Sequence, residues 1–190
     1  MLQMTKQDTD WKVVIDRACQ LDPDAFDTLV NEYAPRLRGF LRKIVRSSDV
    51  DDMVQVLFLR VVRTIGRYQE AGRFEAWIFQ IARNLAHDHL RDRLRQRANY
   101  NGPSEPDRMT LLTASGVTIE EGLERAESAS QIEEALWRLP DTEREVILLR
   151  HFGRLTFEEI AKAMDTPLGT ALARSHRGLS KLRKWVEEPA

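Results

Sequence analysis

Apolar residues recur at intervals of three and four along most of this 190-residue chain, a spacing that places them on one face of an α-helix. The pattern predicts helices over residues 11–20, 25–45, 50–66, 73–97 and 141–152. No stretch alternates apolar and polar residues as a half-buried strand would. The sequence therefore predicts an all-α fold.

Residues typical of helix ends separate these segments. Asp22 or Asp24 is placed to cap the second helix, and the Ser-Ser-Asp sequence at 47–49 ends that helix and caps the third. Pro35 lies inside the second helix, where a proline favours a kink. We therefore expect separate helices joined by short turns.

The last part of the chain has the pattern of a helix-turn-helix. Thr156 and Glu159 form a capping box that begins one helix, and Pro167, with Thr166 as a cap, ends it and begins another at Leu168. The second helix is expected to turn one stripe inward: Leu168, Leu172, Ser175, Leu179, Leu182 and Val186. The opposite face is basic: Arg174, Arg177, Lys181 and Lys184. Such a helix suits the major groove of DNA, and a basic face that is merely solvated is the simpler alternative.

Charge is segregated along the sequence, although the net charge is only −1. Residues 36–97 hold 14 basic and 7 acidic side chains (net +7), residues 99–145 hold 4 and 11 (net −7), and residues 150–185 hold 8 and 3 (net +5). The near-neutral total argues against a generic nucleic-acid coat protein. The segregation instead indicates two basic lobes that flank an acidic connector.

Helical periodicity is lost between residues 97 and 116, where Asn, Gly, Pro and Ser cluster. The predicted organisation is two small helical domains, residues 1–97 and 129–190, joined by a flexible linker over residues 98–128. The C-terminal domain carries the helix-turn-helix.

The fourth predicted helix has a polar flank beside its apolar stripe. At 100° per residue this flank contains Arg73, Gln80, Asn84, His87 and Arg91, with Trp77 at the border. Guanidinium groups neutralise phosphates and a ring stacks on an unpaired base, so the flank suits nucleic acid. The alternative, that Trp77 belongs to the hydrophobic core and the arginines are only solvated, is equally compatible with the spacing.

The sequence offers little for catalysis or metal binding. His87 and His89 lie about 200° apart around a helix, and Cys19 is the single cysteine. No glycine-rich phosphate loop or nucleophile motif occurs. We expect no catalytic residue, metal, cofactor or enzymatic activity. Since no apolar run reaches the roughly 18 residues of a membrane span and no signal peptide is present, we expect a cytoplasmic protein without membrane insertion.

Four blocks, in this order, resemble the extracytoplasmic-function (ECF) sigma factors, promoter-recognition subunits of bacterial RNA polymerase. They are DAFDTLVNEYAPRLRGFL at 24–41, DDMVQVLFLRV at 51–61, RFEAWIFQIARNLAHDHLR at 73–91, and the block from LPDTEREV to SKLR at 139–183. The resemblance implies a protein that binds core RNA polymerase, recognises the minus-thirty-five and minus-ten promoter elements and promotes strand opening. It implies promoter DNA, the clamp and flap of polymerase, and an anti-sigma factor as partners.

The resemblance also implies roles for individual residues. Core polymerase binding falls to Asp51, Asp52, Gln55, Val56 and Phe58. The minus-ten element is held by Tyr68, Phe74, Trp77, Arg83, Asn84, His87 and Arg91. The minus-thirty-five duplex is read by Thr170, Arg174, His176, Arg177 and Lys181. At position 172 this chain has leucine where the family usually has lysine.

Two other functions fit the helical pattern. One is a helix-turn-helix repressor or activator whose first lobe binds a ligand or dimerises, and the other makes the first lobe a pure protein-interaction module. A repressor is expected to bind a palindromic site alone as a dimer, whereas a sigma factor binds promoter DNA strongly only with core polymerase.

Overall fold

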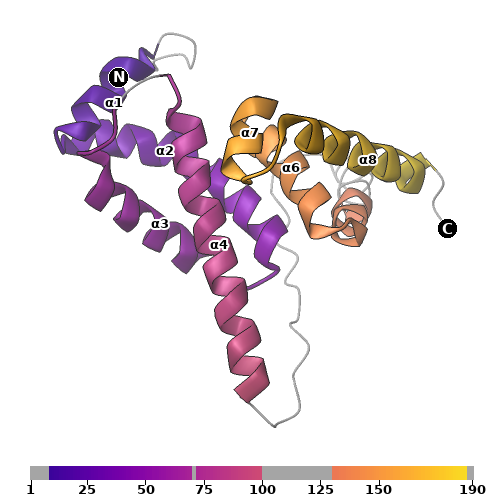
Figure 1. Cartoon of the computed structure of the whole chain (residues 1–190). Coiled ribbons are helices and arrows are strands. Elements are labelled where there is room, and N and C mark those ends of the chain that lie inside the picture. Colours follow the sequence, from indigo (N-terminus) through magenta and orange to yellow (C-terminus); the bar gives the residue numbers. More distant parts are fainter. Residues whose placement is uncertain (1–8, 70–71, 100–129, 188–190) are drawn as a thin grey trace, which may run out of the picture.

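The computed structural model describes residues 9–69, 72–99 and 130–187, and all regular secondary structure in these ranges is helical (Figure 1). The predicted linker, residues 98–128, lies almost entirely outside the described residues. The helices form two lobes that pack against each other. Among the described helices, none is both long and apolar enough to cross a membrane.

The first lobe consists of α1 (Trp11–Cys19), α2 (Pro23–Val45), α3 (Val50–Ile65) and α4 (Phe74–Asn99). Asp22 caps α2, because its carboxylate accepts hydrogen bonds from the backbone N–H groups of the first turn. The helix α2 packs against the other three, and its buried stripe supplies the centre of the lobe. The fully buried side chains of α2 that do so are Leu29, Tyr33, Leu37, Phe40 and Leu41.

The second lobe consists of a helical segment over residues 130–138, α6 (Asp141–Phe152), α7 (Phe157–Ala163) and α8 (Leu168–Glu187). The predicted capping box at the start of α7 is confirmed: the Thr156 hydroxyl accepts from the Glu159 N–H, and the Glu159 carboxylate accepts from the Thr156 N–H. Together, α7 and α8 are the helix-turn-helix.

The predicted inward stripe of α8 is wrong in most positions. Leu168, Leu172, Leu179 and Val186 are exposed. Small residues face the lobe instead: Ala171, Ser175 and Gly178. A Cβ at Gly178 would lie 2.7 Å from Ile147 Cδ1, so α8 approaches α6 too closely for larger side chains. The helix is therefore rotated from the orientation that a leucine stripe predicts.

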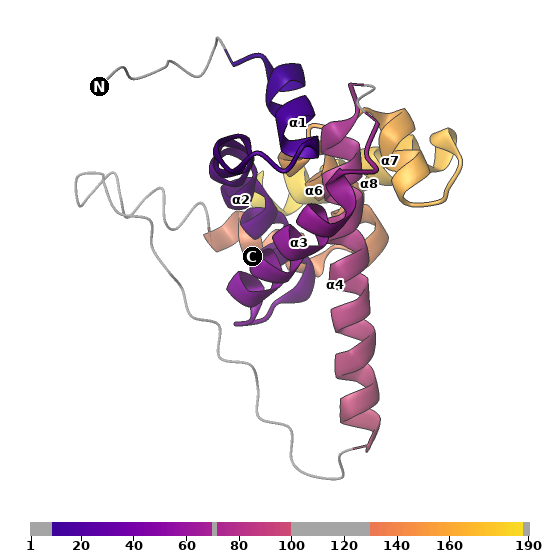
Figure 2. The ribbon, with the colours of Figure 1, turned by 90° about the vertical axis from the view of Figure 1, so that its left-hand side faces the viewer.

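The two lobes meet where α2 and α4 contact α6 and α7 (Figure 2). The Phe152 ring lies over Gly39, where a Cβ would be 2.4 Å from Phe152 Cε1. The buried apolar residues of both lobes consequently form one continuous cluster. The C-terminal part of α4 projects away from this body (Figure 1), and Leu94 there is 64% exposed.

Candidate nucleic-acid interface

The polar flank predicted for α4 is on the surface. Arg73, Gln80, Asn84 and Arg91 are exposed, and Trp77 is half-buried at the edge of the flank. The Arg91 guanidinium donates a 2.5 Å hydrogen bond to Asp88, which also lies 3.7 Å from Arg60 on α3. The flank therefore adjoins the outer face of α3.

An aromatic cluster supports the start of α4. The Trp77 ring lies 5.0 Å from Tyr68 and 5.5 Å from Phe74, between centroids, and Phe74 lies 5.3 Å from Tyr33. Phe74, a predicted minus-ten residue, is only 1% exposed. In this structure it supports the half-buried Tyr68 and Trp77 rings and presents no surface of its own to a base.

Tyr33 anchors this cluster to α4. Its hydroxyl donates a 2.9 Å hydrogen bond to the Glu75 carboxylate. Burial, reinforced by the negative charge of Glu75, raises the pKa of Tyr33 well above its usual value. The phenol thus stays protonated and holds the first turn of α4 against α2.

Arg83 and His87, two further predicted minus-ten residues, pair with a carboxylate of the other lobe. Glu145 Oε1 lies 2.7 Å from Arg83 Nε and 2.9 Å from His87 Nε2, and the Glu145 side chain is 5% exposed. The Arg83 Nε–H is not aligned with this oxygen, so that contact is an ion pair without a good hydrogen bond. Glu145 lies far along the chain from α4, and the sequence patterns did not identify it.

The outer face of α3 carries the residues implied in polymerase binding. Asp51, Asp52, Gln55 and Val56 are exposed as expected. Phe58 is half-buried and packs edge-on against the Phe26 ring at 6.5 Å. The face also exposes two residues that we had not predicted: Leu59 (57%) and Val62 (41%). Val56, Leu59 and Val62 follow one another at intervals of three residues, a second, weaker apolar stripe that could have identified them.

The predicted minus-thirty-five residues differ in how much of each side chain is exposed. His176 is exposed, whereas Thr170 and Arg174 are half-buried on the flank of α8 nearer the lobe. Arg177 and Lys181 pair with Glu143 of α6, at 3.3 Å and 2.9 Å. These two cations are therefore already paired in this structure.

Glu143 joins α6 to α8. Burial alone would raise the pKa of this carboxyl, but the hydrogen bonds and charges of Lys181 and Arg177 outweigh burial and hold the pKa below its usual value. The carboxylate is thus charged at neutral pH and fixes the rotation of α8 about its axis.

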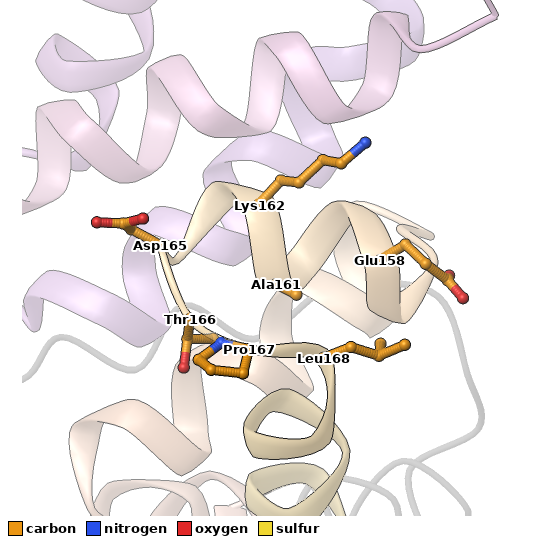
Figure 3. A pocket seen from close by; sticks show the side chains of 7 residues that line it. All are labelled: Glu158, Ala161, Lys162, Asp165, Thr166, Pro167 and Leu168. Atoms are coloured by element: carbon orange, nitrogen blue, oxygen red, sulfur yellow. The ribbon is translucent and has the colours of Figure 1, made fainter.

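The turn between α7 and α8 borders a shallow depression. Its lining residues are Glu158, Ala161, Lys162, Asp165, Thr166, Pro167 and Leu168. Figure 3 shows Glu158 and Leu168 pointing to the same side, with Asp165 directed away from them. Leu168 and Leu172 begin the exposed face of α8, which has no acidic residue from 168 to 186.

Comparison with known proteins identifies both lobes. The family model described as Sigma-70 region 2 matches residues 29–96, and that described as Sigma-70, region 4 matches residues 135–184. The RNA polymerase sigma factor CarQ of Myxococcus xanthus is 36% identical over 166 residues, which cover 87% of this chain and 91% of CarQ. The ECF RNA polymerase sigma factor SigW of Bacillus subtilis is 28% identical over 174 residues, which cover 88% and 91%.

Among solved structures, the sigma factor RpoE in complex with the anti-sigma factor NepR, from Bartonella quintana, has a similar fold. The TM-score is 0.70 at 20% identity, over 87% of this chain and 98% of that one. The chain belongs to the sigma-70 family and, within it, to the ECF sigma factors. It is a transcription initiation factor that binds core RNA polymerase, recognises the minus-thirty-five and minus-ten elements and promotes strand opening. The repressor and interaction-module alternatives are thereby set aside.

Proposed function

We propose that the lobes divide promoter recognition between them, residues 1–97 binding core polymerase and the minus-ten element and residues 129–190 binding the minus-thirty-five element, with residues 98–128 as the linker. The outer face of α3 docks on the clamp of the largest subunit, and the α4 flank holds the separated minus-ten strand. The observation that supports this is the adjacency of the two faces, which the Arg60 and Asp88 side chains join at 3.7 Å. DNA held on α4 then lies beside the polymerase surface.

The remaining partners follow from the family. The second lobe contacts the polymerase flap, and an anti-sigma factor binds the protein, a proposal supported by the complex of the similarly folded Bartonella sigma factor with NepR. The protein acts in the cytoplasm, where polymerase and promoter DNA are. It acts as a binding factor, without catalytic residue, metal or cofactor of its own.

Strand opening tests the placement of the minus-ten surface. Asn84 is exposed on the polar flank of α4, which lies beside the buried stripe of that helix. Its amide can pair with the edge of an unstacked base, a contact worth about 1 to 3 kcal/mol. We expect Asn84→Ala holoenzyme to bind duplex promoter but to open it about 5- to 150-fold less well. Permanganate reactivity of unpaired thymines measures opening, and a template with a pre-melted minus-ten bubble should restore activity only in part.

Gln96→Ala is the matched control for Asn84→Ala. Gln96 is also an exposed amide on α4, but it lies in the projecting end of the helix. Holoenzyme that carries Gln96→Ala should open the promoter as well as wild-type holoenzyme does. Wild-type opening by Asn84→Ala would instead show that the minus-ten surface lies elsewhere.

Leu172 is expected to contribute to minus-thirty-five recognition through thymine. It is 44% exposed in the second turn of α8, the part of a recognition helix that meets base edges. An exposed leucine in the major groove packs on the thymine C5-methyl group. Burying one methyl contributes about 0.8 kcal/mol, or about fourfold in affinity.

Deoxyuridine, which lacks this methyl, provides the test. Replacing single minus-thirty-five thymines by deoxyuridine should weaken wild-type holoenzyme binding about fourfold at one position. Leu172→Ala should bind both duplexes equally, whereas Val186→Ala, at the far end of α8, should keep the difference. If deoxyuridine weakened binding equally in the wild type and in Leu172→Ala, Leu172 would not contact the thymine methyl group.

A further inference from the structure

The contact between the lobes uses groups that are also proposed to bind DNA. Glu145, in the middle of α6, places its carboxylate against Arg83 and His87 of α4. A carboxylate that is 5% exposed is costly unless it is paired with positive charge or hydrogen-bond donors. Here α4 supplies both, so the pairing is part of what holds the lobes together.

A second contact fixes the end of α6. Arg36 on α2 donates hydrogen bonds from Nε to the Phe152 carbonyl at 2.8 Å and from a terminal nitrogen to the Gly153 carbonyl at 3.2 Å. These carbonyls lie at the C-terminus of α6, where the helix dipole is negative. The Phe152 ring covers Gly39 beside them.

In the charged contacts described between the lobes, the positive group always belongs to the first lobe. Lys43 of the first lobe lies 3.6 Å from Glu133 of the second, in addition to the contacts of Arg36 and Arg83. In each pair the donor belongs to the basic first lobe and the anionic or carbonyl oxygen to the second. The second lobe therefore presents to α2 and α4 the kind of oxygen that a DNA backbone presents.

We propose that the α6 face bearing Glu145 is an intramolecular docking surface that occupies a phosphate-binding site formed by Arg83 and His87. The Glu145 carboxylate and a backbone phosphate of the minus-ten strand compete for the same donors. This inference rests on the proposed placement of the minus-ten strand on α4. Its consequence is that the free protein binds that strand weakly until its lobes separate.

The dimensions of a promoter require such a separation. Elements centred about 25 base pairs apart lie roughly 85 Å apart on duplex DNA at 3.4 Å per pair. In the closed arrangement the two lobes touch, because Glu145 of α6 lies 2.7 Å from Arg83 of α4. The closed arrangement cannot hold both elements at once, so promoter binding by the holoenzyme and the contact at Glu145 exclude each other.

Two variants are designed to separate the lobes, one on each side of the contact. Glu145→Gln keeps the size of the side chain and removes its charge. Gly39→Leu places a side chain against the Phe152 ring. The three atoms nearest to a Cβ at position 39 are all atoms of that ring. Glu158→Gln, at an exposed glutamate on α7, is the matched control for charge.

The full-length free protein is tested with a fluorescent single-stranded oligonucleotide that carries the minus-ten sequence of a promoter selected with the holoenzyme. Lobe separation is followed by energy transfer between dyes at Lys12→Cys and Ser180→Cys in a Cys19→Ser background. Glu145→Gln and Gly39→Leu should each increase dye separation and strengthen oligonucleotide binding about tenfold, because a larger fraction of molecules is competent to bind. Glu158→Gln should do neither.

Three results would overturn the proposal. The first is unchanged dye separation in both variants, and the second is increased separation without tighter binding, since Glu145 would then not mask the site. The third is a free wild-type protein that binds the oligonucleotide as tightly as the holoenzyme does. Holoenzyme carrying Arg83→Ala and His87→Ala tests the underlying placement separately, because it loses minus-ten binding only if these residues contact the strand.

Discussion

A Leu59→Arg variant is expected to fold as the wild type does and to lose core polymerase binding by about a hundredfold. Leu59 is 57% exposed between Val56 and Val62 on the outer face of α3, so the new side chain displaces no residue of the hydrophobic core. In a polymerase complex the same position would bury an unpaired charge and lose an apolar anchor. Central contacts of this kind cost about 2 to 4 kcal/mol when they are removed.

Titration of the labelled variant with core polymerase measures this loss. Val13→Arg is the matched control, because Val13 is 50% exposed on α1, away from the face proposed to bind polymerase. It should bind core polymerase normally. If Leu59→Arg also bound with wild-type affinity, the outer face of α3 would have to be abandoned as the docking surface.

A Phe79→Ala variant is expected to lose about 3 to 5 kcal/mol of unfolding free energy. Phe79 is fully buried, meets the Phe40 ring edge-on at 5.5 Å and lies beneath the Arg36 guanidinium at 5.5 Å. A Cβ at Gly153 would lie 3.2 Å from its ring, so Phe79 also supports the contact between the lobes. Small proteins have only about 5 to 15 kcal/mol of stability, and the loss should be large on that scale.

Urea unfolding followed by circular dichroism measures this change as a lower midpoint. Leu94→Ala, in the projecting end of α4, removes a large apolar side chain that is 64% exposed and should change stability by no more than about 0.5 kcal/mol. A loss below about 1 kcal/mol for Phe79→Ala would contradict the packing described for α2 and α4.

Most helix ends could be predicted from the sequence because they depend on groups within one turn of each other, although Asp49, at the expected cap of α3, makes no side-chain capping hydrogen bond. Asp22 beside Pro23 and the pair Thr156 and Glu159 satisfy backbone N–H groups locally, and both sets cap helices as expected. The long apolar stripe of α2 likewise predicted a helix that continues through Pro35. The sequence also contained the four blocks that identify the family.

The rotation of α8 could not be predicted in this way. Leucine at 168, 172 and 179 favours an inward stripe, but burial depends on which face a neighbouring helix can approach. Gly178 allows α6 to come close, and Glu143 of the same helix pairs with Arg177 and Lys181. Those interactions outweigh the burial of the leucines, which remain exposed on α8.

By itself, the sequence determined the all-α fold, most of the helix boundaries and the family, because each depends on spacing along one helix or on a motif. The spacing within α4 already placed Phe74 on the inward stripe, and it is buried. Only the tertiary structure decided that Glu145 meets Arg83 and His87. The physical reason is that a buried carboxylate acquires its partners from packing between elements distant in the chain. No periodicity within α4 or α6 encodes that contact.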